Sequence, residues 1–527
     1  MLKDLLDEVT ISNTPLSTPS QPLINTATFP SNPIMKFLFL LSLSLFSQVS
    51  ALHGLKAKLL PFNSPQLESQ QVSGKPVYSS EYLPDFQAAQ DATQVDFTSL
   101  GWNGPIQHSG FLSFEGERTS PDPSPLVNTF FWYLPSLDLN PDAPTVMWLQ
   151  GGPGGSSLYG MFGEIGPMGI DGNMTIFERS PAFNWNQKYN LLFLDNPCGV
   201  GFSHSNEESC YVTDEVQVGS DLRSALLQFF EMFPNLRKND FYATGESYAG
   251  KYVPAVSSTI HSANAKLSPD DKGFINIKGM AIGDGAMDPP SQFNKFSDLL
   301  YYNGLANSKE RKVFQQYETN IQNALAKGDT VEAFNQFDVM LNGDFIQPTY
   351  YMNVTGMTNY FNSQQGDCGS CEPEYYGDWV VDENIRSKIH VGDVAYNSFN
   401  ETVEVKLKGD WMVGVVDMIT PLLNDPDFKV LIYSGQIDII LGAPLTEQFL
   451  DNLAWDGDEL YSNSDKQIWK IDDVRAKEDP VAGYVNYVEK YQFTYAVVRG
   501  AGHMVPLDQP QRAFDMIERF VENNHVY

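Results

Sequence analysis

The stretch "FYATGESYAG", from Phe241 to Gly250, decides the fold, because it carries a serine between small residues directly after a short apolar run. A serine nucleophile on a sharp strand-to-helix turn needs small neighbours, in the pattern G-x-S-x-G, since larger side chains would clash with the backbone. Residues 245–249 read GESYA, so alanine fills the last position. The same string is also typical of a surface serine in a tight turn. Partner residues elsewhere in the chain must therefore decide what Ser247 does.

Apolar runs that lead into glycine-containing turns divide the rest of the chain: "PTVMWLQGG", "YNLLFLDNPCG", "DFYATGES", "IKGMAIGDG", "KVLIYSGQID" and "YAVVRGAGH". Such runs, spaced by helix-length intervals, are typical of buried strands in a mostly parallel sheet. The stretch "DEVQVGSDLRSALLQFFEMFP" has apolar residues at helical spacing and predicts a crossover helix. We expect an α/β-hydrolase fold, in which helices flank a mostly parallel central sheet.

The strand signals stop between about Pro289 and Asn397, where "SKERKVFQQYETNIQNALAKGDTVEAFNQF" is polar and helical in pattern. The aromatic content of this region argues against a disordered linker, so we interpret it as a largely helical cap insertion. The expected division is an unstructured upstream extension at 1–34, a signal peptide at 35–51, the first part of the core at 52–288, the cap at 289–397 and the second part of the core at 398–527.

The composition excludes some classes of protein. With 42% hydrophobic residues the chain has enough apolar surface for a large core. Its 65 acidic and 33 basic residues give a formal charge of −32. Such a charge repels phosphate backbones and anionic lipid, so nucleic-acid binding is not expected, and it suits a compartment of low pH.

A targeting signal lies near the N-terminus. The string "MKFLFLLSLSLFSQVSALHG" starts at Met35 with a basic residue, continues in an apolar run and ends in small residues before Ala51. This pattern predicts a secretory signal peptide cleaved after Ala51, and the apolar run is too short for a permanent anchor. Translation could start at Met1 or at Met35. We expect a protein of the secretory pathway with no membrane anchor.

Entry into an oxidising lumen favours disulfides among the four cysteines. Pairing by neighbours would join Cys198 to Cys210 and Cys368 to Cys371, whose C-x-x-C spacing is also found in redox and zinc motifs. A single such pair lacks the second ligand pair of a zinc site. Sites of N-glycosylation are expected at the three sequons, Asn173, Asn353 and Asn400.

Candidate partners of Ser247 follow it in the order of an α/β hydrolase, which is serine, acid, histidine. Asp438 comes just after the strand-like "KVLIYSG", and His503 follows "YAVVRGAG" on a loop with glycines before it. The loop could carry the imidazole towards the serine, which makes Ser247, Asp438 and His503 a candidate catalytic triad. The less well placed alternatives are the histidines His108 and His204 and the acids Asp425 and Asp427.

A triad of this kind needs backbone N–H donors for the developing oxyanion. Tyr248 supplies one donor directly after the nucleophile, and Gly152 in "QGGPGGSS" is the candidate for the second. A glycine-rich loop after a strand can also cradle phosphate, but this one lacks the lysine of a phosphate-binding loop.

Together "WLQGGPGGSS", "FLDNPCGVGFS", "GESYAGKYVP" and "VRGAGHMVPLDQP" resemble the serine carboxypeptidases, in family order and over nearly the whole mature chain. Gly155, where many members have a cysteine, and Gln150, where most have asparagine, resemble the vitellogenic-carboxypeptidase-like branch. The resemblance implies removal of C-terminal amino acids from peptides at acidic pH, in a lysosome-like compartment or after secretion. No metal or organic cofactor is expected.

The resemblance also gives Gln150, Glu164 and Glu246 a role, as a hydrogen-bonded group that holds the C-terminal carboxylate of the substrate. From the sequence alone Glu246 would be a solvated turn residue and Glu164 a charge on a helix surface. Facing carboxyl groups share a proton at low pH, which predicts weaker peptide binding as the pH rises. The chain departs from the family in the longer Gln150, in the missing cysteine at Gly155, and in "AIGDG", where aspartate stands for the usual asparagine.

Other functions fit the sequence less well. A zinc carboxypeptidase is disfavoured because no H-E-x-x-H or comparable ligand cluster appears. An acyltransferase of the same fold would keep the triad but would not need Glu164 and Glu246. A catalytically silent lumenal binding protein is the third possibility, and a monomer and a homodimer both remain open.

Overall fold

The computed structural model describes residues 74–118, 124–180, 182–367, 375–471 and 480–523. The predicted upstream extension and signal peptide lie outside these residues, as does the pair Cys368 and Cys371. The limits predicted for the cap and for the two parts of the core stay predictions.

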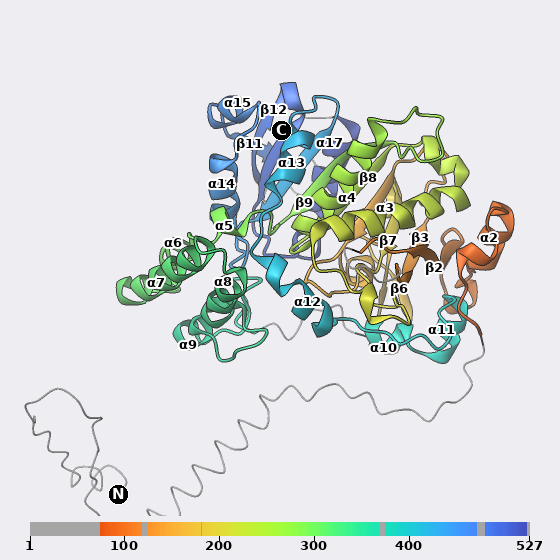
Figure 1. Ribbon diagram of the computed structural model, residues 1–527, viewed down its shortest axis with the longest axis horizontal. Helices are drawn as coiled ribbons and strands as arrows, with labels where there is room; N and C mark the ends of the chain where they lie inside the picture. The colour runs from red at the N-terminus through yellow and green to blue at the C-terminus, as the bar shows by residue number, and fades with distance from the viewer. Residues whose placement is uncertain (1–73, 119–123, 181, 368–374, 472–479, 524–527) are drawn as a thin grey trace, which may run out of the picture. The chain divides into compact units, whose positions relative to one another are not determined.

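A twisted sheet runs through the centre of the described chain (Figure 1). Its strands, in spatial order, are β1 (Gln94–Val95), β2 (Gln107–Glu115), β3 (Leu126–Leu134), β7 (Asn190–Leu194), β4 (Thr145–Leu149), β8 (Phe241–Glu246), β9 (Ile277–Gly283), β10 (Lys429–Gly435), β13 (Phe493–Val498), β12 (Val481–Val488) and β11 (Gln467–Lys470). The two strands β5 (Met168–Ile170) and β6 (Ile176–Glu178) form a separate antiparallel pair.

The strands from β7 to β13 are parallel neighbours, and they are the six runs that the sequence predicted. The prediction of a mostly parallel sheet is therefore confirmed. Both edges are antiparallel: β2 and β3 form a hairpin at one edge, and β12 pairs with β13 at the other. The sequence did not predict these edge strands.

The central strands are apolar throughout because both faces of the sheet are covered. Successive side chains of β4 alternate between two cores: Met147 and Leu149 belong to one, Val146 and Trp148 to the other. Helices α3 (Glu215–Met232) and α4 (Ala249–Asn264) cover the first face, while α17 (Pro510–Glu522) covers the second. This two-sided burial is typical of parallel sheets. Helix α3 is the crossover helix that the sequence predicted.

Other helices connect the strands or decorate the sheet. They are α2 (Phe86–Thr93), α5 (Pro289–Gln292), α6 (Phe296–Tyr302), α7 (Ser308–Leu325), α8 (Thr330–Phe337), α9 (Tyr350–Thr355), α10 (Tyr376–Val380), α11 (Glu383–Lys388), α12 (Glu401–Trp411), α13 (Val416–Leu423), α14 (Ala443–Asn452), α15 (Asp458–Ser462) and α16 (Val505–Asp508). Short π-helical turns occur at Gly160–Glu164 and Asp338–Asn342.

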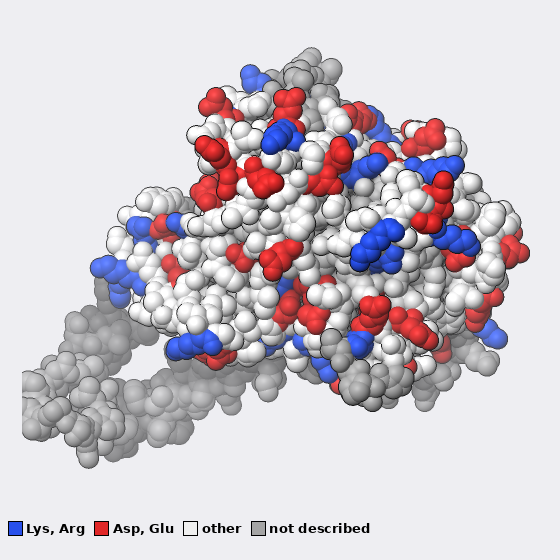
Figure 2. Space-filling model, turned by 45° about the horizontal axis from the view of Figure 1, so that its top comes forward, with Lys and Arg blue, Asp and Glu red and all other residues white. Residues whose placement is uncertain are grey.

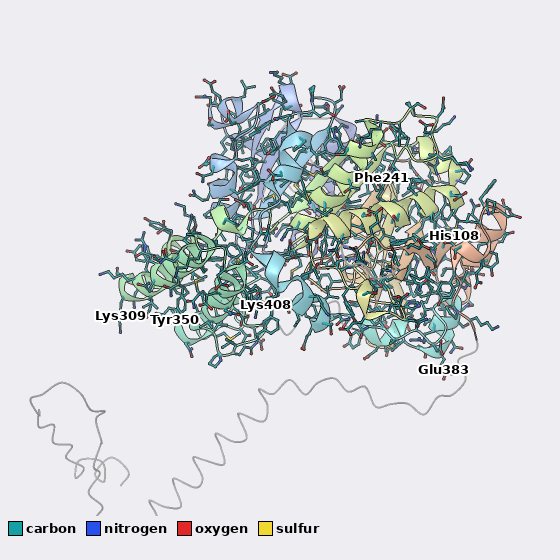
Figure 3. All side chains as sticks on the ribbon, viewed as in Figure 1. His108, Phe241, Lys309, Tyr350, Glu383 and Lys408 are labelled. Atoms are coloured by element: carbon teal, nitrogen blue, oxygen red, sulfur yellow. A yellow bond between two sulfur atoms is a disulfide. The ribbon has the colours of Figure 1, made fainter. Side chains whose placement is uncertain are left out.

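The predicted cap region is helical, but its helices lie in two places. Helices α6 to α9, which carry Lys309 and Tyr350, project from one end of the sheet, whereas Glu383 on α11 lies towards the opposite end, on the side of His108 (Figure 3). Backbone hydrogen bonds explain the second position, since Val77 N donates to His390 O over 3.0 Å. The chain after α9 thus returns across the molecule to the β2 edge.

The surface carries charges of both signs. Figure 2 shows Asp and Glu spread over one face, with Lys and Arg between them. Within the described ranges, no helix combines the length and the apolar character needed to cross a membrane.

Candidate active site

Ser247 lies on the tight turn between β8 and α4. Its φ angle is +64°, a conformation that residues with a side chain rarely adopt, and its N–H donates to Gly283 O over 3.0 Å. The turn needs glycine beside it: a Cβ atom at Gly245 would collide with Leu149 O, and one at Gly250 would lie 2.6 Å from Gly285 Cα. The strained, half-buried serine and its glycines are the geometry of a nucleophile elbow.

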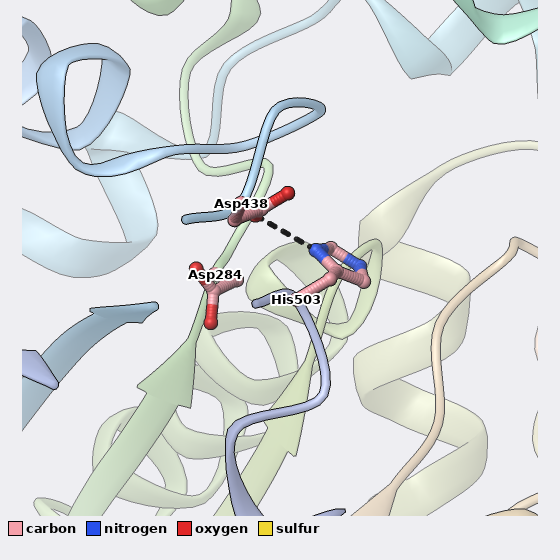
Figure 4. Close-up of side chains that lie close together, drawn as sticks. All are labelled: Asp284, Asp438 and His503. Carbon is pink, nitrogen blue, oxygen red and sulfur yellow. Dashed lines mark hydrogen bonds and ion pairs between the residues drawn. The ribbon is translucent and has the colours of Figure 1, made fainter. Parts of the chain in front are cut away.

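His503 and Asp438 are joined by a hydrogen bond of 2.9 Å from Nδ1 to Oδ2 (Figure 4). Both side chains are buried, with exposed fractions of 2% and 0%. Asp438 is held by further donors, since its Oδ1 accepts from Ile440 N and its Oδ2 from Leu441 N. His503 Nε2 has no hydrogen-bond partner among the described residues, so this nitrogen is available to accept a proton.

The loop that carries His503 is packed against a segment that the sequence analysis did not single out. The imidazole stacks on Phe361 with ring centroids 5.1 Å apart, and His503 N donates to Phe361 O over 2.7 Å. Gly502 N donates to Asp508 Oδ2 over 2.7 Å. A Cβ atom at Gly502 would collide with Phe361 O, which explains the glycine before the histidine.

The two predicted oxyanion donors lie close together. A Cβ atom at Gly151 would be 2.5 Å from Tyr248 N, so the loop can approach the elbow only because it has no side chain there. Gly152 has a φ of +117°. Neither Gly152 N–H nor Tyr248 N–H has an acceptor within the part of the chain that the structure describes. Helix α4 begins directly after Tyr248, so its positive end also faces this space.

The buried side chain of Asp195 holds the glycine-rich loop at residues 150–157 in place. Asp195 accepts from Ser156 Oγ over 2.6 Å and from Ser157 N over 3.1 Å. Burial raises the pKa of Asp195 to about 6. The sequence analysis did not identify this support, because Asp195 lies in "FLDNPCG" far from the loop in sequence.

The outer side of the loop is held by a segment from the second half of the chain. Gly155 forms an isolated β-bridge with Phe399, and Asn400 N donates to Gly154 O over 3.0 Å. A second bridge joins Gly201 to Asn397. Backbone pairing therefore holds Gly154 and Gly155 against this segment.

Gln150, Glu164 and Glu246 lie together beneath the loop. Gln150 Nε2 donates to Glu246 Oε1 over 2.8 Å, and Gln150 Oε1 accepts from Trp148 Nε1 over 2.9 Å. Glu164 and Glu246 are buried, with exposed fractions of 1% and 0%, so the interpretation of both as surface charges is wrong. Both oxygens of Glu164 and Oε2 of Glu246 have no hydrogen-bond partner in the described ranges.

Burial raises the pKa of Glu164 to about 8. Burial and the neighbouring Glu164 raise the pKa of Glu246 well above its usual range. The pair therefore keeps protons at acidic pH and can donate hydrogen bonds. The sequence analysis did not identify Arg179, whose positive charge opposes the rise in the pKa of Glu164.

The side chain of Tyr248 points away from the site into a buried ionic cluster. Its hydroxyl donates to Asp410 Oδ2 over 3.3 Å, and Lys251 Nζ forms an ion pair with the same carboxylate. Lys251 is fully buried, and Asp410 lies on α12. The cluster thus ties the elbow helix to a helix of the second half of the chain.

The alternative histidines and acids lie elsewhere. Asp425 pairs with His261 over 2.8 Å at the surface, so it is not the acid that contacts His503. His108 Nδ1 lies 3.2 Å from Thr93 Oγ1, and His204 Nε2 lies 3.2 Å from Tyr78 OH. Neither contact involves Ser247.

Among the described residues, Asp284, Asp438 and His503 carry possible metal-ligand atoms within 4.8 Å of one another. A cation at this place would have to displace the proton of the 2.9 Å hydrogen bond between His503 Nδ1 and Asp438 Oδ2. The donor set therefore suits acid–base chemistry.

The disulfide predicted between Cys198 and Cys210 is present, with Cα atoms 6.0 Å apart. The sequon residues Asn173 and Asn353 are exposed. Asn400 is half-buried, and its side chain is occupied: Oδ1 accepts from Thr402 N at the start of α12, and Nδ2 donates to Gly199 O over 2.8 Å. A glycan on Asn400 would compete with the second bond.

Comparison with known proteins agrees with this geometry. A family model described as serine carboxypeptidase matches residues 104–523. The venom serine carboxypeptidase of Apis mellifera is 42% identical over 417 residues, which cover 79% of this chain and 84% of the relative. The vitellogenic carboxypeptidase of Aedes aegypti is 35% identical over 460 residues, covering 86% and 91%.

The fold is shared with a solved structure. The crystal structure of Kex1(delta)p, a prohormone-processing carboxypeptidase from Saccharomyces cerevisiae, matches with a TM-score of 0.69 at 22% identity and covers 82% of this chain and 96% of that one. The predicted α/β-hydrolase fold is thereby confirmed. From the family match and the similar relatives, the chain belongs to the serine carboxypeptidase family, hydrolases that act on peptides, and it is related to the vitellogenic carboxypeptidases.

Proposed function

We propose that this serine carboxypeptidase releases C-terminal amino acids from peptides at acidic pH, with Ser247, His503 and Asp438 as its catalytic triad. The observation that carries the proposal is the buried 2.9 Å bond between His503 and Asp438, on loops that follow strands near the elbow of Ser247. His503 Nε2 takes the proton of Ser247 as its oxygen attacks the scissile carbonyl. Asp438 fixes the imidazole tautomer and stabilises the imidazolium.

The N–H groups of Gly152 and Tyr248 stabilise the oxyanion that forms in this step. The imidazolium then gives its proton to the leaving amino group, which frees the C-terminal amino acid and leaves an acyl-enzyme on Ser247. Water, activated by His503, hydrolyses the ester and restores the enzyme. Every proton in this cycle passes through His503 Nε2, so no cofactor is required.

The carboxylate of the substrate is held by Gln150, Glu164 and Glu246 in this proposal. Three buried carboxyl oxygens of the two glutamates lack a partner in the described residues, which supports a polar ligand there. Because the raised pKa values keep protons on the pair, the site can receive an anion at acidic pH without repelling it. An acyltransferase would have no use for such a group.

The destination that we propose is the secretory pathway, with either secretion or delivery to a lysosome. The support is the signal-like string at residues 35–51, the disulfide of Cys198, and a relative that is named as a venom protein.

The test compares an N-blocked dipeptide with its C-terminal amide at pH 5 and pH 7, using protein expressed from Met35 in a secretory host. Faster cleavage of the free acid than of the amide at pH 5 supports the proposal. Ser247→Ala should lower kcat by at least about 10⁴-fold. If neither peptide is cut while an organophosphate still labels Ser247, the acyltransferase becomes the better interpretation.

A further inference from the structure

Asp284 lies directly after strand β9. Its side chain is fully buried and its φ is +41°. Asp284 N donates to Tyr433 O over 2.8 Å, and Asp284 Oδ1 accepts from Gly435 N over 2.7 Å. The backbone of β10 therefore fixes the carboxyl group from two directions.

The second oxygen of this carboxyl group is buried and has no hydrogen-bond partner among the described residues. Asp284 lies beside Asp438 and His503 (Figure 4), with side-chain donor atoms of the three within 4.8 Å of one another. An ionised carboxylate would leave a buried, uncompensated charge at this oxygen, whereas a carboxylic acid has its proton there.

Burial and the neighbouring Asp438 raise the pKa of Asp284 well above its usual range. Glu246, at the end of β8, also raises the pKa of Asp284. The titratable groups that face Asp284 from the packed elements are Glu246 from β8, Tyr433 and Asp438 from β10 and its loop, and Tyr495 and His503 from β13 and its loop. None of them is a permanent cation, so the neutral form of Asp284 is favoured.

Asp438 has room for one more donor. Its Oδ2 already accepts from His503 Nδ1 and Leu441 N, but its Oδ1 accepts only from Ile440 N among the described residues. A carboxylate has about four lone-pair sites, two on each oxygen. Because a side-chain oxygen of Asp284 lies within 4.8 Å of one of Asp438, the hydroxyl of a protonated Asp284 can supply this donor.

We propose that Asp284 is a positioning residue that stays protonated during catalysis and turns its hydroxyl towards the carboxylate of Asp438, so that this carboxylate stays aligned with His503. The role rests on the triad proposed above. In this role Asp284 acts as a neutral hydrogen-bond donor. Of the two aspartates only Asp438 is then negatively charged, and its charge stabilises the imidazolium of His503.

The experiment measures the rate at which diisopropyl fluorophosphate labels Ser247, followed by intact mass, between pH 4 and pH 8. The full secreted protein is compared with Asp284→Asn and Asp284→Ala, and exposed Asp427→Asn is the matched control. Organophosphate labelling needs the triad but no peptide. If the unchanged enzyme is not labelled, the triad itself is wrong and this inference falls with it.

Asp284→Asn should be labelled within about threefold of the unchanged rate, because the amide also donates. Its pH profile should overlay that of the unchanged enzyme. If Asp284 were ionised, replacing it would remove a negative charge near His503, and the rise in rate would shift to lower pH by about one unit or more. Such a shift would overturn the proposal.

Asp284→Ala should be labelled about 10-fold to 100-fold more slowly, since a hydrogen bond to a charged group is lost. Labelling at the unchanged rate would overturn the positioning role. If the alanine variant does not fold, the pH profile of Asp284→Asn still decides the protonation state. Slower labelling after treatment with a chelator would point to a bound cation at the three residues and would also overturn the proposal.

Discussion

Gln150 Nε2 donates a 2.8 Å hydrogen bond to Glu246 Oε1 and so connects the ends of the adjacent strands β4 and β8. Trp148 Nε1, on the other side of the amide, donates to Gln150 Oε1 over 2.9 Å. The amide is therefore oriented, with its NH2 group towards the carboxyl pair. The side chain of Gln150 thus reaches both Trp148 and Glu246.

This arrangement predicts how binding depends on pH. The raised pKa values mean that Glu164 and Glu246 both hold protons at pH 5, and that Glu164, whose pKa is about 8, loses its proton as the pH rises through that value. The KM for a dipeptide with a free carboxylate should therefore rise about twofold between pH 5 and pH 8, and about tenfold by pH 9. Steady-state kinetics over this range will measure it.

The matched control is a peptide ester or amide, which has no carboxylate to bind. Its KM should change little over the same range. Glutamine at this position cannot ionise, so in Glu246→Gln the KM for the free acid should depend less on pH. Equal pH dependence for both substrates would show that the glutamates do not hold the carboxylate.

A buried acid on α12 should limit stability at neutral pH. Glu404 is 1% exposed, and burial together with Asp344 raises its pKa to about 10. Because the folded state holds this proton more tightly than the unfolded state, stability is highest below about pH 4.5 and falls as the pH rises towards 10. Glu404→Gln should increase the free energy of unfolding at pH 7 relative to pH 5 by at most about 3 kcal/mol.

Calorimetric unfolding of Glu404→Gln at both pH values will test this. Glu401→Gln, on the same helix but exposed, should change the stability by no more than about 0.5 kcal/mol at either pH. If the two variants gave the same pH dependence, Glu404 would be ionised in the folded protein.

The buried ion pair of Lys251 and Asp410 should be strongly coupled. Lys251→Met would leave the Asp410 carboxylate without its cation, and should lower the free energy of unfolding by about 3–5 kcal/mol. The double variant with Asp410→Asn should lose much less than the sum of the single losses, because no buried charge is then left unpaired. Denaturant unfolding of the four proteins gives this cycle, and additive losses would contradict it.

The glycine after the elbow should not tolerate a side chain. In Gly250→Ala the new methyl group would lie 2.6 Å from Gly285 Cα, a backbone atom that cannot rotate away. The expected loss is about 1–3 kcal/mol in the free energy of unfolding, with slower organophosphate labelling. Gly409→Ala is the control, since that glycine lies in α12 with nothing within 4 Å of the new methyl group. It should be neutral or stabilising by up to about 1 kcal/mol.

The strands that the sequence predicted are those buried on both faces, because burial leaves an uninterrupted apolar run. Strand β2 was missed since buried polar residues interrupt its pattern. Ser109 Oγ donates to Ile389 O over 2.8 Å, and Ser113 Oγ donates to Asn128 Oδ1 over 2.7 Å. These partners are distant in sequence, so nothing local marks the two serines as buried.

The candidate site, too, can be predicted from the sequence only in part. The order of Ser247, Asp438 and His503 can be predicted because each follows a recognisable strand. The burial of Glu164 cannot, since it results from the packing of the π-helical turn Gly160–Glu164 under the sheet end. The environment of Asp284 depends on a loop that comes more than a hundred residues later in the sequence.

The segment from Asn397 to Asn400 closes the outer side of the oxyanion loop mainly through its backbone. Gly201 N donates to Asn397 O over 2.8 Å, and Ser156 N donates to Ser398 O over 2.9 Å. These hydrogen bonds therefore hold the segment in place without the covalent link through the preceding helices. A single proteolytic nick at the turn between α7 and α8 should yield a two-chain enzyme, whose fragments stay associated and whose active site stays assembled.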